Sequence, residues 1–161
     1  MTTDSSVDEA WGKLADTGED EREAQMAQRY TELSSLSEEA RRSRLLAMAK
    51  AEYALPDAKL SPFTRSRMRV WLKMDPENAK KVAISYSAIM NQMPGPAAMR
   101  RVALVQTLAR GFSLEDQERL AALVPQVFPG RPTIVAEVLS TTPSSTPPAS
   151  KKQWWAFWRR S

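Results

Sequence analysis

The sequence predicts an all-α fold, a compact bundle of five or six short helices with a disordered N-terminal leader and C-terminal tail. Three observations support this class. Apolar residues recur at spacings of three and four along most of the chain, as on one face of a helix. Capping residues and prolines mark helix starts and stops at short intervals. Nowhere does an alternating apolar–polar run meet a hairpin turn, so strands are not expected.

The first nineteen residues predict an acidic, largely disordered leader. Residues 1–40 carry 11 acidic and 3 basic side chains, whereas residues 41–161 carry 8 acidic and 20 basic ones. The leader is either a solvated segment or an arm that screens a basic surface until a partner displaces it. Trp11 lies within it, and the sequence does not decide whether this side chain docks on a partner or on the helical domain.

The predicted helical domain covers residues 20–139. Ser35-Leu36-Ser37-Glu38 offers a capping box between a first helix over 20–33 and a second over 38–54. Pro56 is expected to stop the second helix, and Ser61-Pro62 to open a third over 62–74, because proline suits the first helical position. Further helices are predicted over 76–92, 97–110 and 114–124 by Asp75-Pro76, Pro94-Gly95-Pro96 and Ser113. The apolar run 133–139 fits either helical turns or a strand.

The core prediction centres on the helix over 76–92. Its stripe is Ala79, Val82, Tyr86, Ile89 and Met93. We expect the stripe to face apolar residues of the next two helices, namely Met99, Val102, Ala103, Leu108, Ala109, Leu120, Leu123 and Val124. Trp71 is expected in the core.

Internal repetition is weak at the sequence level. An apolar residue followed by serine opens predicted helices at Leu36-Ser37, Leu60-Ser61 and Phe112-Ser113. The intervals of 24 and 52 residues are irregular, so we interpret this as recurrent capping and not as a solenoid repeat.

No catalytic signature is present. The chain has no cysteine and no histidine, which removes thiolate chemistry, the commonest general base and the commonest metal ligand. No glycine-rich phosphate loop occurs. The clusters of acidic residues fall at predicted helix starts, where the helix dipole favours them. We therefore expect no enzyme activity, no cofactor and no metal site.

A basic stripe on the third helix is a candidate phosphate-binding site. Arg65, Arg69 and Lys73 lie at i, i+4 and i+8, and such a stripe can contact the phosphates of nucleic acid or lipid. The alternative is a solvated helix face without a ligand. No recognition-helix pattern supports nucleic-acid binding, which is the less expected partner.

The most informative segment is residues 151–161, which we call the docking segment. It holds three of the five tryptophans, and a Pro/Ser/Thr-rich tether over 140–150 precedes it. Its candidate docking residues are Lys151, Lys152, Trp154, Trp155, Phe157, Trp158, Arg159 and Arg160. Tryptophan suits the headgroup level of a bilayer, and the flanking cations suit anionic lipid. Trp and Arg are also the residues most enriched at protein interface hot spots.

The energetics favour reversible docking. Four half-buried aromatics of about 200 Å² each contribute about 10 kcal/mol at ~25 cal/mol/Å². Ordering the segment costs a comparable amount. The sequence leaves four alternative roles for the docking segment. It is a peripheral membrane anchor with an amphipathic tail, a short linear motif for a protein pocket, a segment that packs back on the domain, or a segment that stacks on nucleic-acid bases.

The sequence therefore predicts a non-enzymatic helical adaptor or scaffold. The docking segment would localise it to an anionic membrane surface or a larger protein assembly, and the helical domain would hold a protein partner. The first six residues are polar and acidic, so we expect a cytoplasmic location, on the inner membrane face or within a larger assembly. The alternative is a nucleic-acid-binding regulator that uses the basic stripe.

Overall fold

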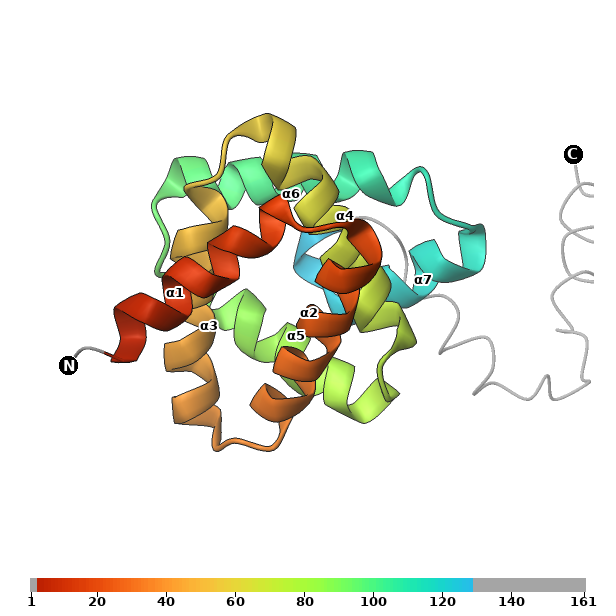
Figure 1. Ribbon diagram of the computed structural model, residues 1–161. Helices are drawn as coiled ribbons and strands as arrows, with labels where there is room; N and C mark the ends of the chain where they lie inside the picture. The colour runs from red at the N-terminus through yellow and green to blue at the C-terminus, as the bar shows by residue number, and fades with distance from the viewer. Residues whose placement is uncertain (1–2, 129–161) are drawn as a thin grey trace, which may run out of the picture. The chain divides into compact units, whose positions relative to one another are not determined.

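Seven α-helices make up the part of the chain that the structure, a computed structural model, describes (residues 3–128; Figure 1). They are α1 (Thr3–Lys13), α2 (Glu19–Ser34), α3 (Glu38–Tyr53), α4 (Asp57–Lys73), α5 (Pro76–Met90), α6 (Gly95–Ala109) and α7 (Leu114–Leu123). Short 3-10 helices cover Leu14–Asp16 and Pro125–Val127. The all-α prediction is confirmed, but the expected count of five or six helices was too low. The predictions for residues 129–161, including the run 133–139 and the tether, lie outside the described residues.

The additional helix is α1, which lies in the expected leader. It packs on α3, and Trp11 is only 3% exposed in the core. The Trp11 ring meets the rings of Tyr30 and Phe63 edge-on, with centroids 5.5 Å apart in both pairs. The boundary placed at residue 20 is therefore corrected, because one large aromatic side chain ties this polar segment to the core. The same burial and ring contacts show that Trp11 is a core residue.

The helices repeat with a fixed period. Their N-terminal caps are residues 18, 37, 56, 75, 94 and 113, a constant step of 19. A partly buried apolar side chain precedes five of these caps. These side chains are Leu36, Leu55, Met74, Met93 and Phe112. An apolar residue just before the cap can pack against the first turns of the helix and fix the angle of entry.

Hydrogen bonds repeat in the same register. The Arg22 Nε donates to the Ser66 Oγ at 2.9 Å, and nineteen residues later the Arg41 Nε donates to the Ser85 Oγ at 2.9 Å. Each arginine also donates from Nη1 to the carbonyl oxygen five residues before it, at 3.1 Å in both cases. The expectation that no repeat exists was therefore wrong. The 19-residue period lies in which positions are buried and which positions cap a helix. Different residue types can fill these positions, so the period is hard to recognise in the sequence alone.

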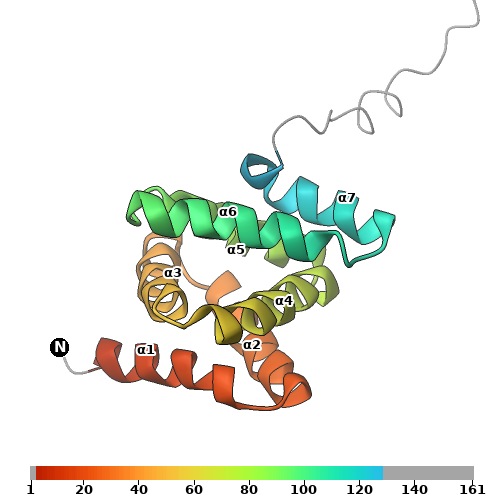
Figure 2. The same cartoon turned by 90° about the horizontal axis from the view of Figure 1, so that it is seen from above.

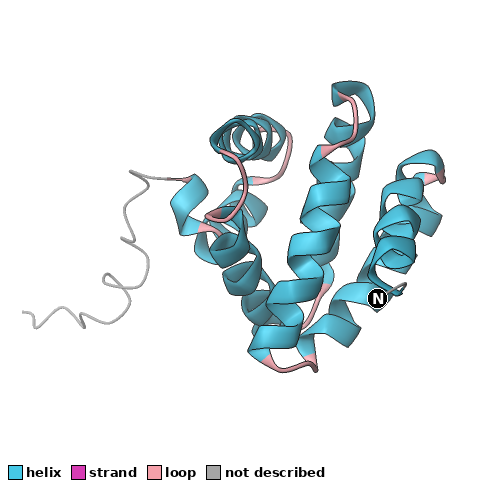
Figure 3. Ribbon diagram, turned by 90° about the vertical axis from the view of Figure 1, so that its left-hand side faces the viewer, coloured by secondary structure: helices cyan, strands magenta, loops and turns pink. Residues whose placement is uncertain are grey.

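The repeat produces a stacked array. Each helix packs on the second helix further along, so α1 contacts α3, α2 contacts α4, α3 contacts α5, α4 contacts α6 and α5 contacts α7. Helices three apart also meet, since α2 contacts α5 and α4 contacts α7. Figure 2 shows α1 and α2 at one end of the array and α6 and α7 at the other. Figure 3 shows that helices and short connections account for all of the described chain. A stack of similar units along the chain is the organisation of helical repeat proteins.

The core confirms most of the predicted stripe and corrects two residues. Ala79, Val82, Tyr86 and Ile89 are buried, as is Trp71. Leu108, Ala109, Leu120 and Val124 are also buried, whereas Met93, Val102 and Leu123 are partly exposed. Met99 and Ala103 are exposed instead of facing α5, because they lie on the outward side of α6.

Helix α4 begins earlier than predicted. It starts at Asp57 with Pro56 as its cap, and Pro62 lies inside it. The first turn is held because Leu60 is buried and because Arg100 donates to the carbonyls of Tyr53 and Leu55 and to the Asp57 carboxylate, each at 3.0 Å. Tertiary contacts thus override the local preference for a start at Ser61-Pro62.

Replacing the exposed Pro62 by alanine is expected to stabilise the fold. The proline lacks the N–H that would bond to the carbonyl of Ala58, and a proline inside a helix is about 3 kcal/mol less favourable than alanine. We expect the free energy of unfolding to rise by about 1–3 kcal/mol, measured by urea denaturation with circular dichroism. Ala58→Ser is the control, because it does not restore the backbone hydrogen bond that residue 62 fails to donate. A loss of stability in Pro62→Ala would mean that the proline fixes the start of α4.

Candidate functional site

The predicted basic stripe lies along one face of α4, and two of its three cations are already paired. Arg69 forms ion pairs with Glu19 and Glu23 of α2, and the Lys73 Nζ lies 3.0 Å from a Glu23 carboxylate oxygen. Arg65 is exposed and forms no ion pair with any described residue. The structure therefore brings the three residues together on one face. An added phosphate at Arg69 or Lys73 would have to compete with the two carboxylates.

This pairing bears on the expected screening of basic surface by the acidic N-terminal residues. Glu19 and Glu23 lie in the first turns of α2, and their carboxylates meet the C-terminal half of α4. Lys59 is tied in the same way to Asp16, with Nζ and the carboxylate oxygen 2.6 Å apart. All these side chains are at least 37% exposed except Glu23, which is 13% exposed. Exposed ion pairs are individually weak, about 0–1 kcal/mol, so they position α2 on α4 more than they stabilise it.

A groove of about 390 Å³ runs beside these ion pairs, between α2, α4 and the start of α7. Leu72 and Phe112 contribute apolar surface, and Asp116 and Arg119 add charges. The Arg119 Nη2 donates to the Leu72 carbonyl at 2.5 Å. Each cation of the groove thus has an acidic or carbonyl partner. The groove has the chemistry of a salt-bridge network at a helix junction, with four acidic and three basic side chains in its lining.

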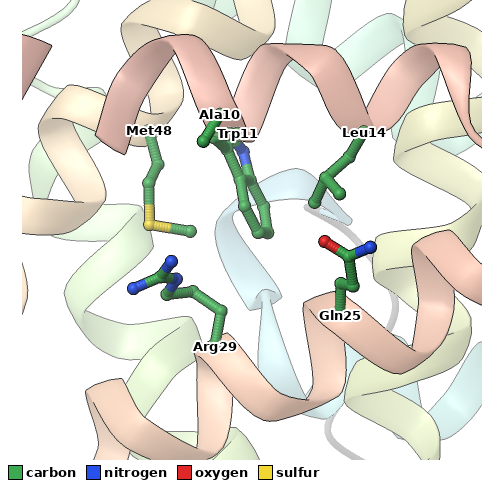
Figure 4. A pocket seen from close by; sticks show the side chains of 6 residues that line it. All are labelled: Ala10, Trp11, Leu14, Gln25, Arg29 and Met48. Carbon is green, nitrogen blue, oxygen red and sulfur yellow. The ribbon is translucent and has the colours of Figure 1, made fainter. Parts of the chain in front are cut away.

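A second, smaller cavity lies under α1 (Figure 4). Its volume is about 60 Å³, and Trp11, Leu14, Gln25, Arg29 and Met48 contribute to its walls. Figure 4 shows Arg29 and Gln25 reaching from α2 toward α1, one on each side of the Trp11 ring. A space of this size has room for ordered water. Within residues 3–128 no group of three or more acidic residues is placed to hold a metal ion.

The sequence reasoning missed a buried polar centre. Glu52 of α3 and Arg67 of α4 form an ion pair and are 0% and 2% exposed. The Arg67 Nη1 also lies 2.6 Å from the Tyr86 hydroxyl of α5, which donates to the second Glu52 oxygen at 3.3 Å. The guanidinium of Arg67 lies over the ring of Tyr86, with 4.7 Å from Cζ to the ring centroid. Three successive helices therefore meet at one salt bridge.

Burial and the neighbouring charges act in opposite directions on the pKa of Glu52, and also on the pKa of Arg67. Burial raises the pKa of Glu52 above its ordinary value, although Arg67 and the Tyr86 hydroxyl lower it. Burial lowers the pKa of Arg67, but Glu52 and the nearby tyrosines outweigh it and leave the pKa raised well above its ordinary value. Arg101 approaches the other part of the Tyr86 ring, at 5.1 Å, and burial lowers its pKa. Arg67 supplies the positive charge that most opposes the rise in the Glu52 pKa.

One signal could have found Arg67. Residues 65, 69 and 73 define the outward stripe, and residue 67 is turned about 200° from 65 at 100° per residue. That turn places Arg67 with Trp71 on the buried side of the same helix. The partner Glu52 has no comparable signal, because it depends on how α3 crosses α4. The contacts of the centre join α3, α4 and α5 in the interior of the array.

The predicted docking residues lie outside the described residues, so the structure does not place Lys151, Lys152, Trp154, Trp155, Phe157, Trp158, Arg159 or Arg160. No helix among residues 3–128 is both long and apolar enough to cross a membrane.

The geometry defines a class of protein by its fold, an array of tandem one-helix repeats. Comparisons with protein-family models, with curated proteins and with solved structures each found no match to this chain.

Proposed function

We propose that this protein is a non-enzymatic helical-repeat adaptor that docks on an anionic membrane surface through residues 151–161. The observation that carries the proposal is the distribution of tryptophan. Trp11 and Trp71, the two in the described helices, are 3% and 4% exposed and serve the core. The other three lie within eleven residues beside four cations, after a tether that contains no large apolar side chain. Tryptophan next to Lys and Arg is the composition of an interfacial anchor.

The helical array supports the adaptor part of this proposal. Repeat arrays expose extended surfaces that are suited to holding partners. A shallow groove of about 460 Å³ is formed by Ala24, Ala27, Val70 and Met74 with neighbouring charges. Such surfaces suit contact with a macromolecule better than chemistry on a small substrate. A nucleic-acid regulator is the weaker proposal, since Glu19 and Glu23 occupy Arg69 and Lys73.

Replacing Trp154, Trp155 and Trp158 together by serine is expected to abolish binding to anionic vesicles. Each half-buried ring contributes about 2.5 kcal/mol before ordering costs. Their loss should therefore weaken binding by more than ~100-fold. The measurement is co-sedimentation of the full chain with vesicles of neutral and of anionic lipid, and with duplex DNA as a further arm. Binding to anionic vesicles should be clearly stronger than binding to neutral vesicles, because Lys and Arg are attracted to anionic headgroups.

The matched control scrambles residues 151–161 within the full chain. A membrane anchor needs composition more than order, so scrambling should preserve most vesicle binding. Unchanged vesicle binding in the triple serine variant would reject the anchor. Absence of vesicle binding in the intact chain, with capture of a protein partner that scrambling abolishes, would replace the membrane by a protein assembly. Binding to duplex DNA that is lost on replacing Arg65, Arg69 and Lys73 by glutamine would favour the regulator.

A further inference from the structure

Four cations lie at the surface of α4. Lys59, Arg65 and Lys73 are exposed, and the Arg69 side chain is 37% exposed. A fifth, Arg67, is buried in the polar centre and takes no part in this surface. We call the four surface residues the cationic face of α4. Lys and Arg side chains attract anionic lipid headgroups, and each cation near such a membrane raises the affinity by about fivefold.

Acidic residues from an earlier part of the chain are paired with this face. The Lys59 Nζ lies 2.6 Å from a carboxylate oxygen of Asp16, and Arg69 forms an ion pair with Glu19. The members of these pairs are 43 and 50 positions apart in the sequence. The pairing therefore depends on how the start of α2 crosses α4.

Two further carboxylates complete the arrangement. Glu23 meets Arg69 at 3.4 Å and Lys73 at 3.0 Å. Asp20 lines the same two grooves as Glu23 and Lys73. We call these four acidic residues the acidic screen, namely Asp16, Glu19, Asp20 and Glu23. Four negative charges thus lie beside the four positive charges of the cationic face and balance them.

Buried contacts hold the acidic screen in place. Arg22 lies within it, is 5% exposed and donates from Nε to the Ser66 Oγ of α4 at 2.9 Å. Met26 and Tyr30, further along α2, are fully buried. The carboxylates therefore cannot leave α4 unless α2 separates from the core. Because charges act over about 8 Å at physiological ionic strength, a lipid headgroup near the cations is also repelled by the carboxylates.

We propose that the acidic screen prevents the cationic face of α4 from docking on an anionic membrane, so that residues 151–161 alone hold the protein there. This inference rests on the proposed membrane function and adds what keeps the array off the lipid. Four unscreened cations at fivefold each would strengthen binding by about 600-fold. The grooves of about 390 and 460 Å³ lie beside the same residues, and the screen leaves them open to a protein partner.

The test uses the full chain with the three tryptophans of the docking segment replaced by serine, which we call the tail-silent chain. Adding Asp16→Asn, Glu19→Gln and Asp20→Asn removes three exposed charges of the screen. Co-sedimentation should then show at least ~10-fold tighter binding to vesicles of phosphatidylcholine with phosphatidylserine, because the cations are no longer balanced. Vesicles of phosphatidylcholine alone should show no gain, and high salt should remove the gain on anionic vesicles.

The matched control is Glu39→Gln, Glu77→Gln and Glu118→Gln in the tail-silent chain. These three side chains are exposed, lie on three different helices and form no ion pair with any described residue. The control changes the net charge equally and should gain no vesicle binding. In the chain without the three screen charges, replacing the cationic face by glutamine should abolish the gain. Circular dichroism checks that each variant melts as the tail-silent chain does.

Four results would overturn the proposal. They are an unchanged affinity after removal of the screen charges, an equal gain in the control, a gain that survives loss of the cationic face, and a gain on duplex DNA but not on vesicles. The docking segment is inactive in all these chains, so the comparison does not depend on it. A gain in the chain without screen charges, with no vesicle binding by the intact chain, would support the screen and reject only the anchor.

Discussion

Replacing Arg67 by methionine is expected to destabilise the protein by about 3–5 kcal/mol. The change removes one member of a salt bridge whose side chains are 2% and 0% exposed, and it leaves the Glu52 carboxylate buried without its cation. It also removes the hydrogen bond to the Tyr86 hydroxyl and the stacking on its ring. Urea denaturation followed by circular dichroism measures the effect. A loss below about 1 kcal/mol would mean that water or another cation solvates Glu52 in the variant.

The stability of Arg67→Met should depend on pH with a definite sign. Burial already raises the pKa of Glu52 in the folded protein, and Arg67 opposes that rise. Without Arg67 the folded-state pKa rises further, so the folded state binds a proton more tightly than the unfolded chain does. The variant should therefore be most stable below the ordinary carboxyl pKa of 4.5 and lose stability as the pH rises above it. The difference in unfolding free energy from the wild type should grow once the pH rises above the folded-state pKa of Glu52 in the wild type, which burial has itself raised. A difference that is constant with pH would contradict the role of Glu52.

The double variant Arg67→Met, Glu52→Leu is the matched control for this prediction. Replacing both members of a buried ion pair by apolar groups of similar volume is often neutral or stabilising. We expect it to recover most of the loss, within about 1 kcal/mol of the wild type, and to abolish the added pH dependence. If the double variant is as unstable as the single one, the volume of Arg67 and its contact with Tyr86 would outweigh its charge.

Replacing Trp11 by alanine is expected to cost about 3–5 kcal/mol, the usual range for a buried tryptophan. Trp11 is 3% exposed and contacts Tyr30 and Phe63, so its loss opens a cavity between α1 and the aromatic core. Thermal or urea unfolding measures the loss, and hydrogen exchange in α1 reports whether the helix detaches locally. The aromatic Trp11→Phe keeps most of the contact and should cost less than half as much. A change below about 0.5 kcal/mol in Trp11→Ala would restore the interpretation of this segment as a leader outside the fold.

Trp11→Ala and Arg67→Met test two different parts of the array, its first helix and its centre. Trp11 joins the first helix to its neighbours, whereas Glu52, Arg67 and Tyr86 join α3, α4 and α5 at the centre. In repeat arrays stability is a sum of repeat and interface contributions, so a terminal change can release one helix while a central change affects both halves. Hydrogen exchange should therefore show local loss of protection in Trp11→Ala and general loss in Arg67→Met.

Local signals were sufficient for most helix boundaries. Ser37, Asp75 and Ser113 cap their helices through side-chain oxygens that accept backbone N–H groups, as their residue types indicate. The start of α4 was misplaced because proline at position 62 has a strong local preference that Leu60 and Arg100 override through distant contacts. The leader was misjudged because composition measures average hydropathy, and one buried tryptophan is enough to dock a short polar helix.

The sequence by itself determined the helical class, most helix limits and the unusual character of residues 151–161, since these depend on nearest neighbours and composition. Only the tertiary structure decided that the helices form a 19-residue array, that α1 belongs to it, and that Arg67 is buried while Arg69 and Lys73 pair with Glu19 and Glu23. The physical reason is that a cap or an apolar spacing acts within a few residues. The partner of a charge is set by how helices cross, which brings together side chains 15 to 50 positions apart.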